Sequence, residues 1–198
     1  ETPGQAQTEN LIAVYSGTHG LANGLGAVLD AARELKRRGQ EKVTLVLVGD
    51  GKCKADLQAE ADADGLDNGR FHAPMPKSEL AGFLASADVG LQVLSDIPAF
   101  YYGTSPNKFF DYLAAGKPVL CNYPGWVSDL IQEHDIGASV PPHDSVAFAD
   151  ALESMLADRP QLKKKGARAR QLAEKQFDRA DLAGQFAACL EATHAEYD

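Results

Sequence analysis

The sequence predicts an α/β domain, a Rossmann-like open parallel sheet of about six strands with helices on both of its faces. Short apolar runs alternate with amphipathic stretches over residues 11–141, as in chains of strand–helix–strand units. The first two apolar runs, "LIAVYSG" (11–17) and "VTLVLVGDG" (43–51), each pass into a glycine turn. Residues from 145 onward have only helical spacing.

The first half of the chain predicts three strands and two helices. The two runs above are strands, and "RFHA" (70–73) is the third. Between the first two, apolar residues recur at helical spacing from Leu21 to Leu35, which predicts a helix from Leu21 to Arg38 that Gly39 ends. A polar helix is expected to follow the second strand and to end near Asp64.

The second half predicts three more strands, at residues 88–94, 118–122 and 137–141. Helices are expected at 77–85, from Ser105 onward and at 127–134, while "SDIPAFYYGT" (95–104) is expected to be irregular. Residues 11–198 therefore form one expected domain. The polar segment 1–10 lacks an initiating Met and is interpreted as a linker remnant of a longer protein.

Composition narrows the functional classes. The formal net charge of −9 makes nucleic acid an unexpected partner. The three cysteines are far apart and no Cys/His spacing suits a metal, so we expect reduced thiols, a cytoplasmic protein and no metal cofactor. No apolar run approaches the roughly 20 residues of a membrane helix. The basic run Lys163–Arg170 is interpreted as a solvated helix face, with a membrane or partner contact as the alternative.

The segment "TSPNKFFDYLAAGKPVL" (104–120) predicts an anion site at the start of a helix. Ser105 is expected to cap the helix and Pro106 to occupy its first position. The free amides of Asn107 and Lys108, the helix dipole and the Lys108 ammonium would then converge on one point. An ordinary capped helix with a solvated lysine is the alternative. Asp111, one turn further on, is expected to bind sugar hydroxyls or else to pair with Lys108.

The turn after the first strand supplies the opposite side of this site. Gly17 allows close approach of the backbone, and Thr18 and His19 offer donors to a phosphate, although His19 could equally be structural or merely exposed. The same stretch contains Gly20-x-x-x-Gly24-x-Gly26, which are the letters of a short-chain dehydrogenase. We set that interpretation aside because Gly24 and Gly26 fall within the predicted helix and the chain has no Tyr-x-x-x-Lys.

The order of the segments resembles the C-terminal, donor-binding domain of retaining GT-B-fold glycosyltransferases. It is most similar to the branch that builds bacterial surface polysaccharides, including the N-acetyl-fucosamine transferases. The matching segments are "YSGTHGLANGLGAVLDAA" (15–32), "LVGDG" (47–51), "FHAPMPKSEL" (71–80), "ADVGLQVL" (87–94), "SPNKFFDYLAAGKPVL" (105–120) and "GWVSDLIQEHDIGASV" (125–140).

The resemblance implies a role for each part of the site. The diphosphate would lie between Gly17–Thr18 and the helix start at Ser105, Asn107 and Lys108. Asp111 matches a family glutamate that binds the ribose hydroxyls. The base would rest on the loop around His72, Ala73 and Pro74, and the sugar would meet backbone near Tyr102, Gly103 and Thr104. The sequence identifies no catalytic residue.

The chain departs from the family pattern at four positions. The first glutamate of the family's Glu-x7-Glu falls at Gly103, and the second is Asp111. An Arg and a Lys that often follow the first strand correspond to His19 and Asn23. Lys108 is therefore the main cation expected at the diphosphate.

The resemblance implies a nucleotide-sugar-binding half of a transferase that uses a UDP sugar without a metal or other cofactor. Its acceptor contacts would come from an absent N-terminal domain, so the isolated domain is expected to be inactive. The full-length protein could associate peripherally with the inner face of the plasma membrane. A nucleotide-sugar 2-epimerase domain and a non-catalytic binding module remain alternatives. The sugar, the acceptor and the oligomeric state stay open.

Overall fold

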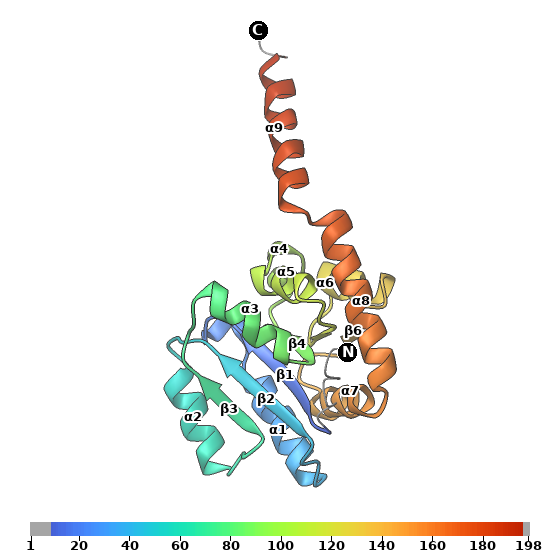
Figure 1. The fold of residues 1–198 in the computed structure, drawn as a ribbon. Coiled ribbons are helices and arrows are strands. Elements are labelled where there is room, and N and C mark those ends of the chain that lie inside the picture. Colours follow the sequence, from blue (N-terminus) through green and yellow to red (C-terminus); the bar gives the residue numbers. More distant parts are fainter. Residues whose placement is uncertain (1–8, 196–198) are drawn as a thin grey trace.

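The computed structural model describes residues 9–195, so the expected linker remnant at residues 1–10 lies almost wholly outside the described residues. Figure 1 shows a sheet between layers of helices, with one helix extending away from the body. The strands are β1 (Leu11–Ser16), β2 (Val43–Val48), β3 (Gly69–His72), β4 (Val89–Gln92), β5 (Val119–Cys121) and β6 (Gly137–Ser139). The helices are η1 (Leu21–Asn23), α1 (Gly26–Arg37), α2 (Lys54–Ala63), α3 (Lys77–Ser86), α4 (Pro98–Gly103), α5 (Asn107–Ala114), α6 (Trp126–Glu133), α7 (Ser145–Ala157), α8 (Arg159–Gln176) and α9 (Arg179–Ala195).

The sheet is parallel throughout, and its order is β3-β2-β1-β4-β5-β6. The chain winds outward from β1 in one direction and then resumes at β4 in the other, which places a topological switch point between β1 and β4. Ser16 pairs with Val48 and Val48 with His72, so β1, β2 and β3 end level with one another. The prediction of a Rossmann-like sheet with six strands is confirmed.

Each face of the sheet buries its own apolar core. One core is built with α1, α2 and α7 and includes Leu29, Leu57 and Leu152. The other is built with α3, α5, α6 and α8 and includes Leu113 and Leu172. Helices on both faces are what the continuous apolar strands require. Along α9, every described side chain is exposed, and this is the helix that leaves the body in Figure 1.

Two predicted elements differ from the structure. The helix expected from Leu21 starts only at Gly26, because Gly24 breaks it with a φ of 56°. A Cβ at Gly24 would lie 2.6 Å from the Ser95 nitrogen, so this turn approaches the end of β4 as closely as only glycine permits. The stretch expected to be irregular contains the short helix α4, which has Pro98 in its first turn.

Candidate functional site

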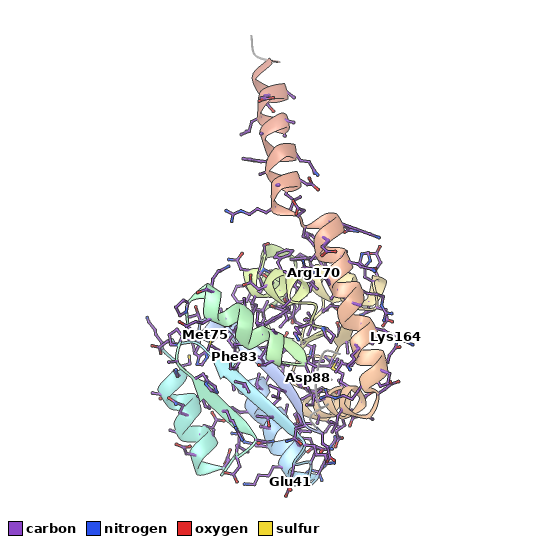
Figure 2. The ribbon with its side chains drawn as sticks, viewed as in Figure 1. Glu41, Met75, Phe83, Asp88, Lys164 and Arg170 are labelled. Carbon is purple, nitrogen blue, oxygen red and sulfur yellow. The ribbon has the colours of Figure 1, made fainter. Side chains whose placement is uncertain are left out.

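A cavity of about 540 Å³ opens at the carboxyl ends of β1 and β2, beside the switch point. Its walls come from the loops after β1, β2 and β3 and from the first turns of α3 and α5. The lining residues are Ser16, Gly17, Thr18, Asn23, Val48, Gly49, Asp50, Pro74, Met75, Lys77, Leu80, Asn107, Lys108 and Asp111. Met75 belongs to the β3–α3 loop and lies close to the start of α3 in Figure 2. Gly17, Asn107, Lys108 and Asp111, which the sequence assigned to one site, all line this cavity.

Lys108 is the half-buried cation of this cavity. Its ammonium lies 4.9 Å from the centre of the Tyr15 ring and 3.4 Å from Asn23 Oδ1. Among the described residues no carboxylate pairs with it. Burial lowers the pKa of Lys108 to about 8. A partly buried ammonium without a counter-ion gains from an anionic ligand, since an anion restores interactions that burial removed.

The start of α5 differs in detail from the prediction. Ser105 does not cap the helix: the N-cap is Pro106, with φ −79° and ψ 110°, and no side chain bonds to the first turn. The first helical residue is therefore Asn107. Because the first amides of an α-helix lack intrahelical acceptors, the amides of Asn107 and Lys108 remain as donors at the cavity wall. Ser105 is exposed and is absent from the lining.

The opposite wall is a backbone turn held by the loop after β2. The Gly17 amide donates to the Val48 carbonyl over 2.9 Å, and the His19 amide donates to the Asp50 carbonyl over 2.8 Å. Gly49 has a φ of 144°, and a Cβ there would lie 1.9 Å from the Gly17 oxygen. Only glycine allows this approach, which explains the "GDG" sequence as a structural requirement of the turn.

His19 has the buried, structural position that was the alternative to its expected donor role, and that donor role stays a prediction. Its side chain is fully buried and does not line the cavity. Its ring packs near those of Tyr15 and Phe71, at centroid distances of 6.0 and 6.1 Å. Burial, followed by the nearby Lys54 ammonium, lowers the pKa of His19. The sequence could not show this, because burial of the turn depends on the β2 loop that closes over it.

Asp111 lines the cavity as predicted. The alternative prediction, that Asp111 pairs with Lys108, is wrong. Its carboxylate lies 3.6 Å from Lys77 Nζ on α3, not beside Lys108. The Lys77 side chain is 84% exposed, and such an ion pair contributes little. Asp111 is therefore free to exchange this contact for a ligand's hydroxyl groups.

Pro74 of the loop expected to hold the base lines the cavity, whereas His72, Ala73, Gly103 and Thr104 do not. His72 and Ala73 are exposed at the end of β3, where the His72 ring lies 5.6 Å from that of Phe83. Figure 2 labels Phe83 on α3. Gly103 is exposed, and the Thr104 carbonyl accepts a hydrogen bond of 2.8 Å from the Trp126 indole. A role in ligand binding stays a prediction for each of these residues.

Two buried tyrosines at the site, Tyr15 and Tyr112, were not predicted from the sequence. The Tyr112 hydroxyl accepts from the Ser16 amide over 2.9 Å and donates to the Leu91 carbonyl over 3.3 Å, which ties α5 to β1 and β4. The Tyr15 hydroxyl donates to the Thr18 carbonyl over 2.8 Å. The sequence could have indicated them only by a tyrosine within an apolar run, because a buried hydroxyl group needs a hydrogen-bond partner.

The described part of the chain contains no cluster of His, Cys, Asp or Glu that could hold a metal ion. Over the same residues, no helix combines the length and the apolar character needed to cross a bilayer.

The fold and cavity define a doubly wound α/β protein with its ligand site at the switch point. The family model described as "Glycosyl transferases group 1" matches residues 3–172. The chain belongs to this family of glycosyltransferases. It is 29% identical to the probable glycosyltransferase WbjE of Pseudomonas aeruginosa, over 71% of this chain and 34% of that protein.

Solved structures show the same fold. The crystal structure of Anabaena Alr3699/HepE in complex with UDP-glucose superposes with a TM-score of 0.79 at 18% identity, over 92% of this chain and 49% of that one. The C-terminal domain of the group 1 glycosyl transferase LpcC from Francisella tularensis gives a TM-score of 0.69 at 18% identity, over 86% of this chain and 87% of that one. The fold matches that of GT-B glycosyltransferases. The chain spans 34% and 38% of the length of two curated relatives, about a third.

Proposed function

We propose that this chain is the donor-binding domain of a glycosyltransferase, which holds a nucleoside-diphosphate sugar for transfer to an acceptor in bacterial surface-polysaccharide or lipopolysaccharide synthesis. A UDP sugar is the expected donor. The observation that carries the proposal is the half-buried Lys108 ammonium, which has no carboxylate partner among the described residues and lies at the amino end of α5. It shares one cavity with the Gly17–Thr18 turn and with Asp111.

Each of these groups is assigned to a different part of the nucleotide sugar. The diphosphate fits between the Gly17–Thr18 turn and the α5 amides, with Lys108 as its cation. Asp111 faces the same cavity and offers two oxygens to the ribose hydroxyls. During transfer, an acceptor oxygen forms a bond to the anomeric carbon while the bond to the diphosphate breaks. Fixed amides and one cation would stabilise the charge that develops on the departing diphosphate, without a metal ion.

Three finer parts of the proposal rest on sequence resemblance. They are the N-acetyl-fucosamine-transferase-like branch, retention at the anomeric carbon, and transfer of a hexosyl or N-acetylhexosaminyl group. A missing N-terminal acceptor domain is supported by the length comparison, since relatives such as WbjE are nearly three times longer than the matched region. A cytoplasmic location, at the inner face of the plasma membrane through the full-length protein, belongs to the same proposal.

A thermal-shift panel of UDP, GDP, ADP and their sugar conjugates tests the proposal. A ligand at 100 times its dissociation constant stabilises the folded state by about 2.7 kcal/mol, which is readily measured. We expect UDP and UDP sugars to give the largest increase in melting temperature. A panel without any increase, or one in which inorganic phosphate performs as well as UDP, would overturn it.

A further inference from the structure

Gly17, Lys108 and Tyr15 approach one another closely at the cavity. A Cβ built on Gly17 would lie 3.0 Å from Lys108 Cε and 3.3 Å from the Tyr15 hydroxyl oxygen. The turn after β1, the first turn of α5 and the last residues of β1 therefore meet around Tyr15. The Tyr15 side chain is fully buried, so it does not contact a ligand itself.

Tyr15 contacts each wall of the cavity through a different part of its side chain. Its ring lies below the Lys108 ammonium at 4.9 Å, a distance at which a ring attracts a cation. Its hydroxyl donates to the Thr18 carbonyl over 2.8 Å, which fixes the turn that carries Gly17 and Thr18. Burial raises the pKa of Tyr15, so the hydroxyl stays protonated and remains a donor.

The Tyr15 ring also stabilises the positive charge of Lys108. A half-buried ammonium without a carboxylate partner holds its proton less firmly unless it finds other favourable contacts. Its contacts among the described residues are the Tyr15 ring and the Asn23 side-chain oxygen, at 3.4 Å. A neutral ring stabilises the charge without neutralising it, so the cation remains able to pair with an anion.

We propose that Tyr15 is a positioning residue for the diphosphate, which sets the place of the Lys108 ammonium with its ring and the shape of the Gly17–Thr18 turn with its hydroxyl. This role rests on the proposed nucleotide-sugar function. It predicts that Tyr15 affects the phosphate part of the ligand and leaves the nucleoside part, which meets Asp111, unchanged.

The two contacts can be separated by substitution. Tyr15→Phe keeps the ring and removes the bond to Thr18, whereas Tyr15→Leu removes both. The readout is the ratio of the dissociation constants of uridine and UDP, measured by calorimetry on the 198-residue chain. We expect the ratio to fall about two- to tenfold for Tyr15→Phe. For Tyr15→Leu we expect a further fall of about five- to thirtyfold from the lost cation–ring contact.

A double-mutant cycle tests whether the ring acts through the lysine. In a Lys108→Met background, Tyr15→Leu should lower the ratio no more than Tyr15→Phe does, because no cation is left above the ring. Tyr123→Phe is the matched control. It removes another buried hydroxyl, which accepts from Gln92 Nε2 over 3.0 Å outside the cavity lining, and it should leave the ratio unchanged.

The outcomes separate this proposal from the proposed function. A wild-type chain that binds no UDP overturns the function, and the role of Tyr15 with it. A wild-type chain that binds UDP, beside a folded Tyr15→Leu variant with an unchanged ratio, overturns the role of Tyr15 alone. Equal weakening of uridine and UDP does the same, since it indicates a general loss of structure. Should the leucine variant not fold, Tyr15→Phe still decides: an unchanged ratio overturns the proposal.

Discussion

Lys108 should titrate when UDP binds. Burial lowers its pKa to about 8, and a bound diphosphate raises that pKa again because opposite charges favour the protonated form. Above pH 8 the free protein therefore loses this proton, and binding must take one up. We predict that UDP affinity falls as the pH rises from 8 to 9.5, and that proton uptake appears in calorimetry with buffers of different ionisation enthalpy.

Lys108→Met is the test variant for this titration. It keeps the unbranched, apolar part of the side chain and removes the charge. We expect it to abolish the proton uptake and to weaken UDP binding by about 10- to 100-fold, the range of a charge-assisted hydrogen bond. Uridine should bind as before. Proton uptake that persists in Lys108→Met would assign the titration to another group.

Asp111 should matter for the nucleoside rather than for the phosphates. Asp111→Asn keeps the shape but leaves one acceptor oxygen in place of two, so we predict about tenfold weaker binding of uridine and of UDP alike. Calorimetry with the two ligands measures this. Glu79→Gln, which changes an exposed acid on α3 outside the cavity lining, is the matched control. Weakening confined to UDP would show that the carboxylate does not contact the ribose.

Prediction from sequence succeeded for residues whose place follows from the ends of elements. Gly17 and Lys108 follow β1 and begin α5, and parallel strands bring such ends together. It left the outcome open where a neighbouring segment decides the environment. His19, for which a structural position was the alternative, is buried beside the β2 loop, and Asp111 pairs with Lys77 from another helix rather than with Lys108 on its own. Spacing along one chain segment contains neither contact.

The position of α5 depends on one glycine of the sheet. A Cβ at Gly90 on β4 would lie 2.4 Å from the Tyr112 ring, which faces the sheet from α5. We predict that Gly90→Ala displaces α5, lowers the free energy of unfolding by about 1–3 kcal/mol and weakens UDP binding. Urea unfolding and calorimetry measure the two effects.

Gly82→Ala is the matched control for this substitution. Gly82 lies within α3, and a Cβ there meets nothing within 4 Å. Alanine at such a position should raise the free energy of unfolding by about 0.5–1 kcal/mol and leave UDP binding unchanged. Gly90→Ala with native stability and affinity would mean that α5 is not held by this contact.

At the scale of elements, the six strands and most helices were predictable because their apolar periodicity is strong. The break between η1 and α1 was not, because residues 21–35 keep helical spacing and only the approach of Gly24 to Ser95 interrupts the helix. The cap of α5 was also missed. Ser-Pro is a common helix start, yet Pro106 has the extended ψ of a residue before the helix.

At the scale of the whole molecule, the cavity is lined by loops and helix starts of this one chain. The chain spans about a third of curated relatives such as WbjE, at 34%. Transfer requires an acceptor oxygen held about 3–3.5 Å from the anomeric carbon, in line with the departing diphosphate. In the proposed function the groups that line the cavity are assigned to the donor, and an acceptor would need further groups of its own.

We therefore predict that the 198-residue chain binds UDP and a UDP sugar but transfers no sugar. The measurement is UDP release with a panel of UDP sugars and candidate acceptors, with a longer protein that contains this sequence as the positive control. Binding without turnover, restored in the longer protein, is the expected result. Turnover by the short chain at the rate of the longer one would contradict it, because the residues around Lys108 and Asp111 would then suffice to position both substrates.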